Sequence, residues 1–234
     1  AFGLTIAPAW FAAPRGSVSV MPASLLPHRS WPRSVEVGAK DDVDHSLDDF
    51  FRKNPPHEVD GPTNLHQYAH AYRTGDNWGA QSILNVWSPY TERSSEFSLS
   101  QIWVVRGSGS SRETVEAGWQ KYRDLYGDYQ PRLFIYFTPD NYGSGGCYNL
   151  TCDAFAQISN SVYIAGGFTN VSQHPHPSTA WEFKLRWQKD GTDGHWWLKY
   201  GDTWVGYYPR SLFDSAGLRD KAAKDAGMDL IVHH

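Results

Sequence analysis

Several features that define common protein classes are missing from this 234-residue chain. No apolar run approaches the roughly 20 residues that a membrane-spanning helix needs, so we expect no membrane partner. Lys and Arg (21) do not exceed Asp and Glu (25), which argues against a nucleic-acid partner bound by phosphate neutralisation. Two methionines do not favour a flexible Met-rich groove. What remains is a globular chain that is unusually rich in aromatic residues, at 15%.

The two cysteines, Cys147 and Cys152, are too few to form a four-ligand zinc site by themselves. Their spacing allows a disulfide that closes a short loop, which we expect, or a pair of reduced buried thiols. Two glycosylation-type sequons begin at Asn149 and Asn170. Residues 1–13 are apolar and rich in small side chains, either because they follow a removed signal peptide or because they form a first strand. We predict a secreted, extracellular protein.

Residues 1–60 differ in composition from the rest of the chain. They contain many of the 14 prolines and a charged patch at 40–53. Only 45–52 has the pattern of a short helix, and the remainder is expected to be extended with turns. We therefore predict an N-terminal arm over 1–60, or the remnant of a pro-segment, followed by one folded domain over 61–234.

Beyond residue 81, apolar and polar residues alternate with period two, which is typical of half-buried strands. Turn residues such as Gly, Asp, Asn and Pro separate the runs. Helix is expected only as a turn at 209–213 and in the Lys- and Ala-rich segment 218–226. Short strands at regular spacing predict an all-β protein, an antiparallel β-sandwich of two packed sheets or a barrel. The expected strands are 82–87, 97–105, 114–120, 132–137, 154–158, 161–165, 180–187, 195–200 and 203–208.

Metal and cofactor sites find little support in the sequence. His174 and His176 flank a proline in a loop without a nearby carboxylate. His66 and His70 have helical spacing but lack the intervening Glu of a zinc peptidase motif. The Gly-rich stretch at 107–109 is too short to hold a phosphate, and no Gly-x-Ser-x-Gly motif occurs. We expect no metal and no cofactor.

Two glutamates lie inside strand-like runs with aromatic neighbours. Alternation places Glu116 on the same face as Gly118 and Gln120, where an acid beside a glycine gap could meet a ligand. Burial there would raise its pKa toward the range of a general acid or base, whereas on a solvated face it would be an ordinary surface glutamate. Glu182 alternates with Lys184 and Arg186, which favours an exposed, ion-paired face.

The aromatic residues have two interpretations. They either fill a core between two sheets or line a groove that stacks on proline rings or sugars. Trp196 and Trp197 are adjacent and must point to opposite faces of a strand. As residues of a substrate groove we predict Trp119, Trp196, Trp197 and Tyr207.

Several ordered motifs over about residues 64–218 resemble the neprosin-domain family, in a microbial rather than plant form. The resemblance implies a secreted glutamic peptidase on an antiparallel β-sandwich, and a plant member of the family cleaves on the carboxyl side of proline. The segment Pro14-Arg15-Gly16-Ser17-Val18 is similar to the signature that precedes the domain. The motifs are Ser95-Glu96-Phe97-Ser98-Leu99-Ser100-Gln101-Ile102-Trp103-Val104, Glu116-Ala117-Gly118-Trp119-Gln120, Leu125-Tyr126-Gly127-Asp128, Pro131-Arg132-Leu133-Phe134-Ile135-Tyr136, Gly146-Cys147-Tyr148-Asn149-Leu150, Trp196-Trp197-Leu198 and Gly206-Tyr207-Tyr208-Pro209.

The family's machinery is a pair of glutamates, of which the first maps onto Glu116. The second lies in a Trp/Tyr-Gly-Gly-Glu motif that this chain lacks, either because the chain stops before it or because the position has drifted. Asp229 is the nearest carboxylate and the candidate second acid. Gln120 is expected to orient water or stabilise the oxyanion.

These residues predict an acid-active, metal-independent endopeptidase that acts as a monomer on peptide or protein substrates. The alternative is a secreted, non-catalytic module that binds a peptide or glycan and has lost the second acid.

Overall fold

The structure is a computed structural model that describes residues 5–6, 26–27, 66–172 and 181–233. The arm at 1–60, apart from its two short strands, the expected helix at 45–52 and the His174/His176 pair lie outside the described residues. None of the helices in the described ranges is long and apolar enough to cross a membrane.

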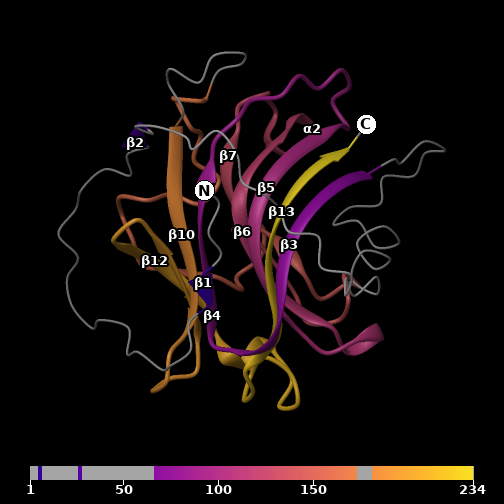
Figure 1. Cartoon of the computed structure of the whole chain (residues 1–234), viewed down its shortest axis with the longest axis vertical. Helices are drawn as coiled ribbons and strands as arrows, with labels where there is room; N and C mark the ends of the chain where they lie inside the picture. Colours follow the sequence, from indigo (N-terminus) through magenta and orange to yellow (C-terminus); the bar gives the residue numbers. More distant parts are fainter. Residues whose placement is uncertain (1–4, 7–25, 28–65, 173–180, 234) are drawn as a thin grey trace.

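Two antiparallel sheets face each other, which confirms the predicted β-sandwich (Figure 1). The six-stranded sheet contains, in spatial order, β3 (His66–Asn77), β13 (Ala223–His233), β5 (Phe97–Arg106), β6 (Glu113–Tyr122), β7 (Arg132–Thr138) and β8 (Cys147–Tyr148). The seven-stranded sheet contains β1 (Thr5–Ile6), β4 (Gly79–Asn85), β10 (Trp181–Lys189), β11 (Trp196–Tyr200), β12 (Thr203–Tyr208) and β9 (Ala156–Gln157), with β2 (Leu26–Pro27) beside β10.

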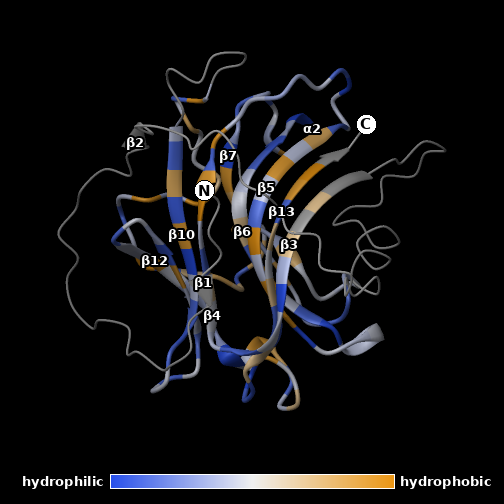
Figure 2. Ribbon diagram, viewed as in Figure 1, coloured by the Kyte–Doolittle hydropathy of each residue, from blue (hydrophilic) through white to orange (hydrophobic). Residues whose placement is uncertain are grey.

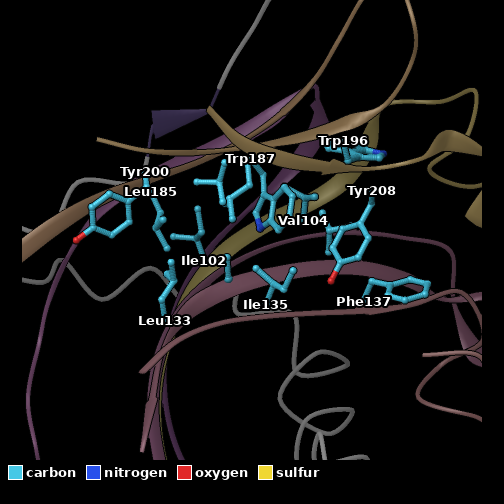
Figure 3. Packing of buried hydrophobic residues seen from close by; sticks show 14 of the residues in the cluster. Ile102, Val104, Leu133, Ile135, Phe137, Leu185, Trp187, Trp196, Tyr200 and Tyr208 are labelled. Carbon is cyan, nitrogen blue, oxygen red and sulfur yellow. The ribbon is translucent and has the colours of Figure 1, made fainter. Parts of the chain in front are cut away.

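The main core lies between the inner faces of the two sheets. Hydrophilic and hydrophobic residues alternate along β10, as the period-two pattern predicts (Figure 2). The large rings of Trp187, Trp196 and Tyr208 are fully buried and face Ile135 and Phe137 from the opposite sheet (Figure 3). Aromatic residues thus fill most of the thickness of the sandwich.

The C-terminal part of the chain differs from the sequence prediction. The expected helix at 218–226 is wrong, because β13 begins at Ala223 and pairs with β3 on one side and β5 on the other. Backbone hydrogen bonds to two neighbours outweigh the helix propensity of Lys and Ala. The expected strand at 161–165 is a series of turns. Helix is confined, among the described residues, to η1 (Gly109–Ser111), α2 (Arg123–Tyr126) and η3 (Arg210–Leu212).

Two buried charges hold the segment that leads into β13. The carboxylate of Glu113 accepts the backbone N–H groups of Asp214 and Leu218 at 2.6 and 2.5 Å. The ammonium of Lys189 donates to the carbonyl oxygens of Leu218 and Arg219, the latter at 2.7 Å. These contacts connect the start of β6 and the end of β10 to the segment before β13.

Replacing Glu113 by Ala leaves two backbone N–H groups without their acceptor. We expect Glu113→Ala to lower the free energy of unfolding by roughly 2–4 kcal/mol, measured by urea denaturation. Glu92→Ala, at an exposed glutamate, serves as the control and should change it by less than about 0.5 kcal/mol. Equal stability of Glu113→Ala and wild type would contradict this role.

Candidate active site

The outer face of the six-stranded sheet, turned away from the main core, carries two buried acidic side chains, Glu116 and Asp229. Glu116 on β6 is paired with Trp103 on β5, and Trp103 is paired with Gly227 on β13. One step along the same face, Gln101 on β5 is paired with Asp229 on β13. The two acids therefore flank β5, and their strands lie roughly 10 Å apart.

Glu116 is almost completely buried, at 1% exposed, and its carboxyl is hydrogen-bonded. The Thr114 hydroxyl donates to Oε1 of Glu116 at 2.7 Å, and the Tyr142 phenol donates to the same oxygen at 2.6 Å. Thr114 precedes Glu116 by two residues and so shares its face of β6. Tyr142 comes from the loop between β7 and β8.

Burial raises the pKa of Glu116 from 4.5 to about 7, because the charged carboxylate loses its hydration. The hydrogen bonds from Tyr142, Thr114 and Gln101 lower this pKa, while the negative charge of Asp229 raises it further. Burial outweighs the donors, so Glu116 stays protonated at acidic pH and can still ionise near neutrality. A carboxyl of this kind is suited to general acid or base chemistry.

Gln101 lies between the strands of the two acids. Its Nε2 donates to Oδ2 of Asp229 at 3.2 Å, and its side chain is near enough to Glu116 to lower the pKa of that carboxyl. Both Gln101 and Asp229 are buried, at 0% and 2% exposed. The Gln101 Oε1 atom is buried with no hydrogen-bond partner among the described residues. An unpaired buried amide oxygen is costly, which makes it a candidate acceptor for a ligand or a water.

Aromatic rings surround the two acids on this face. Tyr136 stacks on Tyr142 with centroids 5.7 Å apart and lies 4.6 Å from the ring of Tyr148. Trp103 packs near Tyr72 at 6.4 Å. Gly227 makes room for Trp103, because a Cβ at this position would lie 2.4 Å from the indole. These rings exclude water from the acids and give the site apolar walls.

The loop that carries Tyr142 is held by its own polar side chains. Asn141 and Tyr142 both have left-handed backbone angles, with φ of 61° and 60°. The Thr138 hydroxyl accepts the Tyr142 N–H at 2.8 Å, and the Asp140 carboxylate accepts the N–H of Gly143 at 3.1 Å. The loop ends at the disulfide between Cys147 and Cys152, which confirms the expected bridge.

The four aromatic residues predicted for the groove lie elsewhere. Trp119 and Trp196 are fully buried in the main core, where the Trp119 indole donates to the carbonyl of Asn85 at 2.6 Å. Trp197 and Tyr207 alternate with core residues of β11 and β12, so they lie on the outer face of the seven-stranded sheet. Their rings pack on each other at 4.6 Å. None of the four shares the face of Glu116, because Trp119 is an odd number of residues away and the others belong to the opposite sheet.

Gln120 shares the face of Glu116 but is engaged elsewhere. Its Oε1 accepts the Tyr126 hydroxyl at 3.1 Å, and the side chain is fully buried. Gln101, and not Gln120, is the amide beside both acids. The sequence prediction missed Gln101, although alternation along β5 with Leu99 and Trp103 carries a signal for it.

Metal ligation finds no support in the described ranges, where no group of three or more His, Cys, Asp or Glu side chains could hold an ion.

Comparison with known proteins gives two kinds of similarity. The family model described as Neprosin matches residues 94–228, which include Glu116 and end one residue before Asp229. A crystal structure of scytalido-glutamic peptidase with a transition state analog inhibitor matches with 12% identity and a TM-score of 0.38. A second structure of that peptidase, with a peptide based transition state analog, matches with 11% identity and a TM-score of 0.35. Each match covers 73% of this chain and 66% of the other, just under two thirds of its length.

The raised pKa of Glu116 predicts a pH dependence of stability. Between the ordinary value of 4.5 and about 7, the folded protein holds a proton that the unfolded chain has lost. The stability contributed by this group is therefore present below pH 4.5 and is lost as the pH rises through about 7. We expect Glu116→Gln to remove this component, measured by urea denaturation across the pH range.

Glu182→Gln is the matched control, because it makes the same substitution on the other sheet. It should leave the component that depends on Glu116 in place. If the free energy of unfolding changes with pH in the same way in the wild type and in Glu116→Gln, the raised pKa of Glu116 is contradicted.

Proposed function

Because the chain belongs to the Neprosin family, we propose that it is a peptidase that hydrolyses peptide bonds with Glu116 and Asp229 as its acid–base pair. The observation that carries this proposal is that the register of β6, β5 and β13 places two buried carboxyls on one sheet face, with Gln101 between their strands and hydrogen-bonded to Asp229. Burial keeps Glu116 protonated at acidic pH, so Glu116 can act as the acid of the pair while Asp229 acts as the base. One protonated and one ionised carboxyl can supply the general acid and the general base that promote the hydrolysis of an amide.

In the first step, ionised Asp229 takes a proton from a water molecule, whose oxygen forms a bond to the peptide carbonyl carbon. Protonated Glu116 gives its proton to the carbonyl oxygen, which produces a neutral tetrahedral intermediate. In the second step, Asp229 returns its proton to the amide nitrogen as the C–N bond breaks. Glu116 then recovers a proton from a hydroxyl of the intermediate. The carboxylic acid and the amine are released as products, and the original protonation states of Glu116 and Asp229 are restored.

Gln101 is placed to hold the water. Its amide N–H donates to Asp229, and its buried Oε1 has no hydrogen-bond partner among the described residues. A water that donates one hydrogen to this oxygen and the other to Asp229 has its lone pair free for attack. We assign Gln101 the role that the sequence analysis gave to Gln120.

The aromatic walls support substrates with a proline near the cleaved bond, as the family resemblance implies. The rings of Trp103, Tyr136 and Tyr148 belong to the small apolar clusters on this face of the sheet, and aromatic rings are a surface on which an apolar pyrrolidine ring can pack. A flat aromatic surface recognises such a ring without needing a polar partner.

Secretion is part of the same proposal, and the disulfide supports it, because such bonds persist in oxidising compartments. Of the two sequons, only Asn170 is exposed. Asn149 is buried and hydrogen-bonded to the Ile135 N–H and the Tyr126 hydroxyl, so it has no room for a glycan in the folded protein.

Cleavage of a proline-containing peptide at acidic pH tests the function. We expect Glu116→Gln and Asp229→Asn each to reduce kcat/KM by about 100-fold or more, since each removes one proton-transfer group. Chelators should have no effect. On the alkaline side, kcat/KM of the wild type should fall as the pH passes through the Glu116 pKa of about 7.

Two control variants sharpen this test. Glu182→Gln should keep full activity, and Asp229→Glu should retain a large part of it, because it preserves the second carboxyl. Saturable peptide binding without turnover in the wild type would overturn the proposal in favour of a binding module. Full activity of Glu116→Gln would also overturn it.

A further inference from the structure

The carboxyl of Glu116 receives its two closest hydrogen bonds on one oxygen. Thr114 and Tyr142 both donate to Oε1, at 2.7 and 2.6 Å. An oxygen that already accepts two hydrogen bonds is a poor position for a proton, whereas a carboxylic acid can carry its proton on either oxygen. The geometry therefore distinguishes the two oxygens of a group that is otherwise symmetric.

We propose that Thr114 and Tyr142 are positioning residues that confine the transferable proton of Glu116 to Oε2. The inference rests on the proposed function, in which Glu116 gives this proton to the peptide carbonyl oxygen. In that step the Oε2–H bond breaks and a bond from hydrogen to the carbonyl oxygen forms. The negative charge left on Glu116 is stabilised at Oε1 by the two donors, so they assist the transfer as well as direct it.

Tyr142 is suited to a permanent donor role. Burial and the neighbouring charge of Glu116 both raise the pKa of the Tyr142 phenol, so it keeps its proton throughout the working pH range. A hydroxyl that never ionises next to Glu116 can donate to it in both protonation states.

The backbone around Tyr142 has an unfavourable conformation, which the positioning role of Tyr142 explains. Two successive non-glycine residues, Asn141 and Tyr142, adopt left-handed angles, each of which is unfavourable by about 1 kcal/mol or more. The Thr138 hydroxyl and the Asp140 carboxylate hold the turn, and Tyr136 stacks on the Tyr142 ring. The result of these contacts is that the phenol oxygen lies against Oε1 of Glu116.

The substitutions Thr114→Val and Tyr142→Phe remove each donor while keeping the shape of the side chain. Because both donors lower the pKa of Glu116, we expect this pKa to rise in each variant and to rise further in the double variant. It is measured by carbon-13 NMR titration of the glutamate carboxyls, with the Glu116 signal assigned by its loss in Glu116→Gln. The alkaline limb of the pH–activity profile should shift to higher pH in parallel.

Kinetics at acidic pH give a second readout. We expect kcat to fall about tenfold or more in each single variant while KM changes by less than about twofold, since the donors act on proton transfer and not on peptide binding. Thr114→Ser restores the hydroxyl and should recover both kcat and the Glu116 pKa. Tyr163→Phe is the matched control, because Tyr163 is 61% exposed and its hydroxyl donates only to the nearby Asn160 carbonyl.

The outcomes separate this inference from the proposed function. An unchanged Glu116 pKa in a folded Thr114→Val or Tyr142→Phe variant overturns the positioning role, whatever the activity. If the Glu116 pKa rises in the two variants but the wild-type protein does not hydrolyse peptides, the result supports the positioning of the proton and rejects the peptidase. Reduced kcat without any pKa change would indicate a merely structural role, and near-UV circular dichroism identifies a variant that has not folded.

Discussion

The site depends on the register of three antiparallel strands, β6, β5 and β13. That register brings Glu116, Gln101 and Asp229 to one face, although 128 residues separate Gln101 from Asp229. A shift by one residue in either pairing would turn one acid toward the main core and separate the pair. Gly118 helps to fix the pairing of β5 and β6, because any Cβ there would collide with the Ser100 carbonyl.

Burial determines which protonation state Glu116 has in this geometry. A glutamate on an open sheet face would be ionised throughout the physiological range, and its hydrogen bonds would only strengthen that state. Desolvation by the surrounding rings reverses the balance at Glu116 and places its pKa near 7. The donors Thr114, Tyr142 and Gln101 keep this shift within a range where the proton can still leave. Apolar walls and polar donors thus act in opposite directions on one carboxyl.

Much of this arrangement could be predicted from local patterns. Alternation identified most of the strands and placed Glu116 with Gly118 and Gln120 on one face, and the spacing of Cys147 and Cys152 suggested their bridge. The same patterns could not tell which face of each strand is turned to the other sheet. Trp119 and Trp196 were therefore expected in a groove, whereas they fill the core. The segment 218–226 was misjudged because the neighbours of β13 are distant in sequence.

The sequence by itself determined the period of the strands, the all-β class and the presence of an acid in an aromatic-rich strand. These are local properties, set by the side-chain alternation of a single strand. Only the tertiary structure decided that β13 inserts between β3 and β5, and that Asp229 and Gln101 lie beside Glu116. Strand order depends on hydrogen bonds and packing between segments far apart in the chain, and such pairings leave no periodic trace in either partner alone.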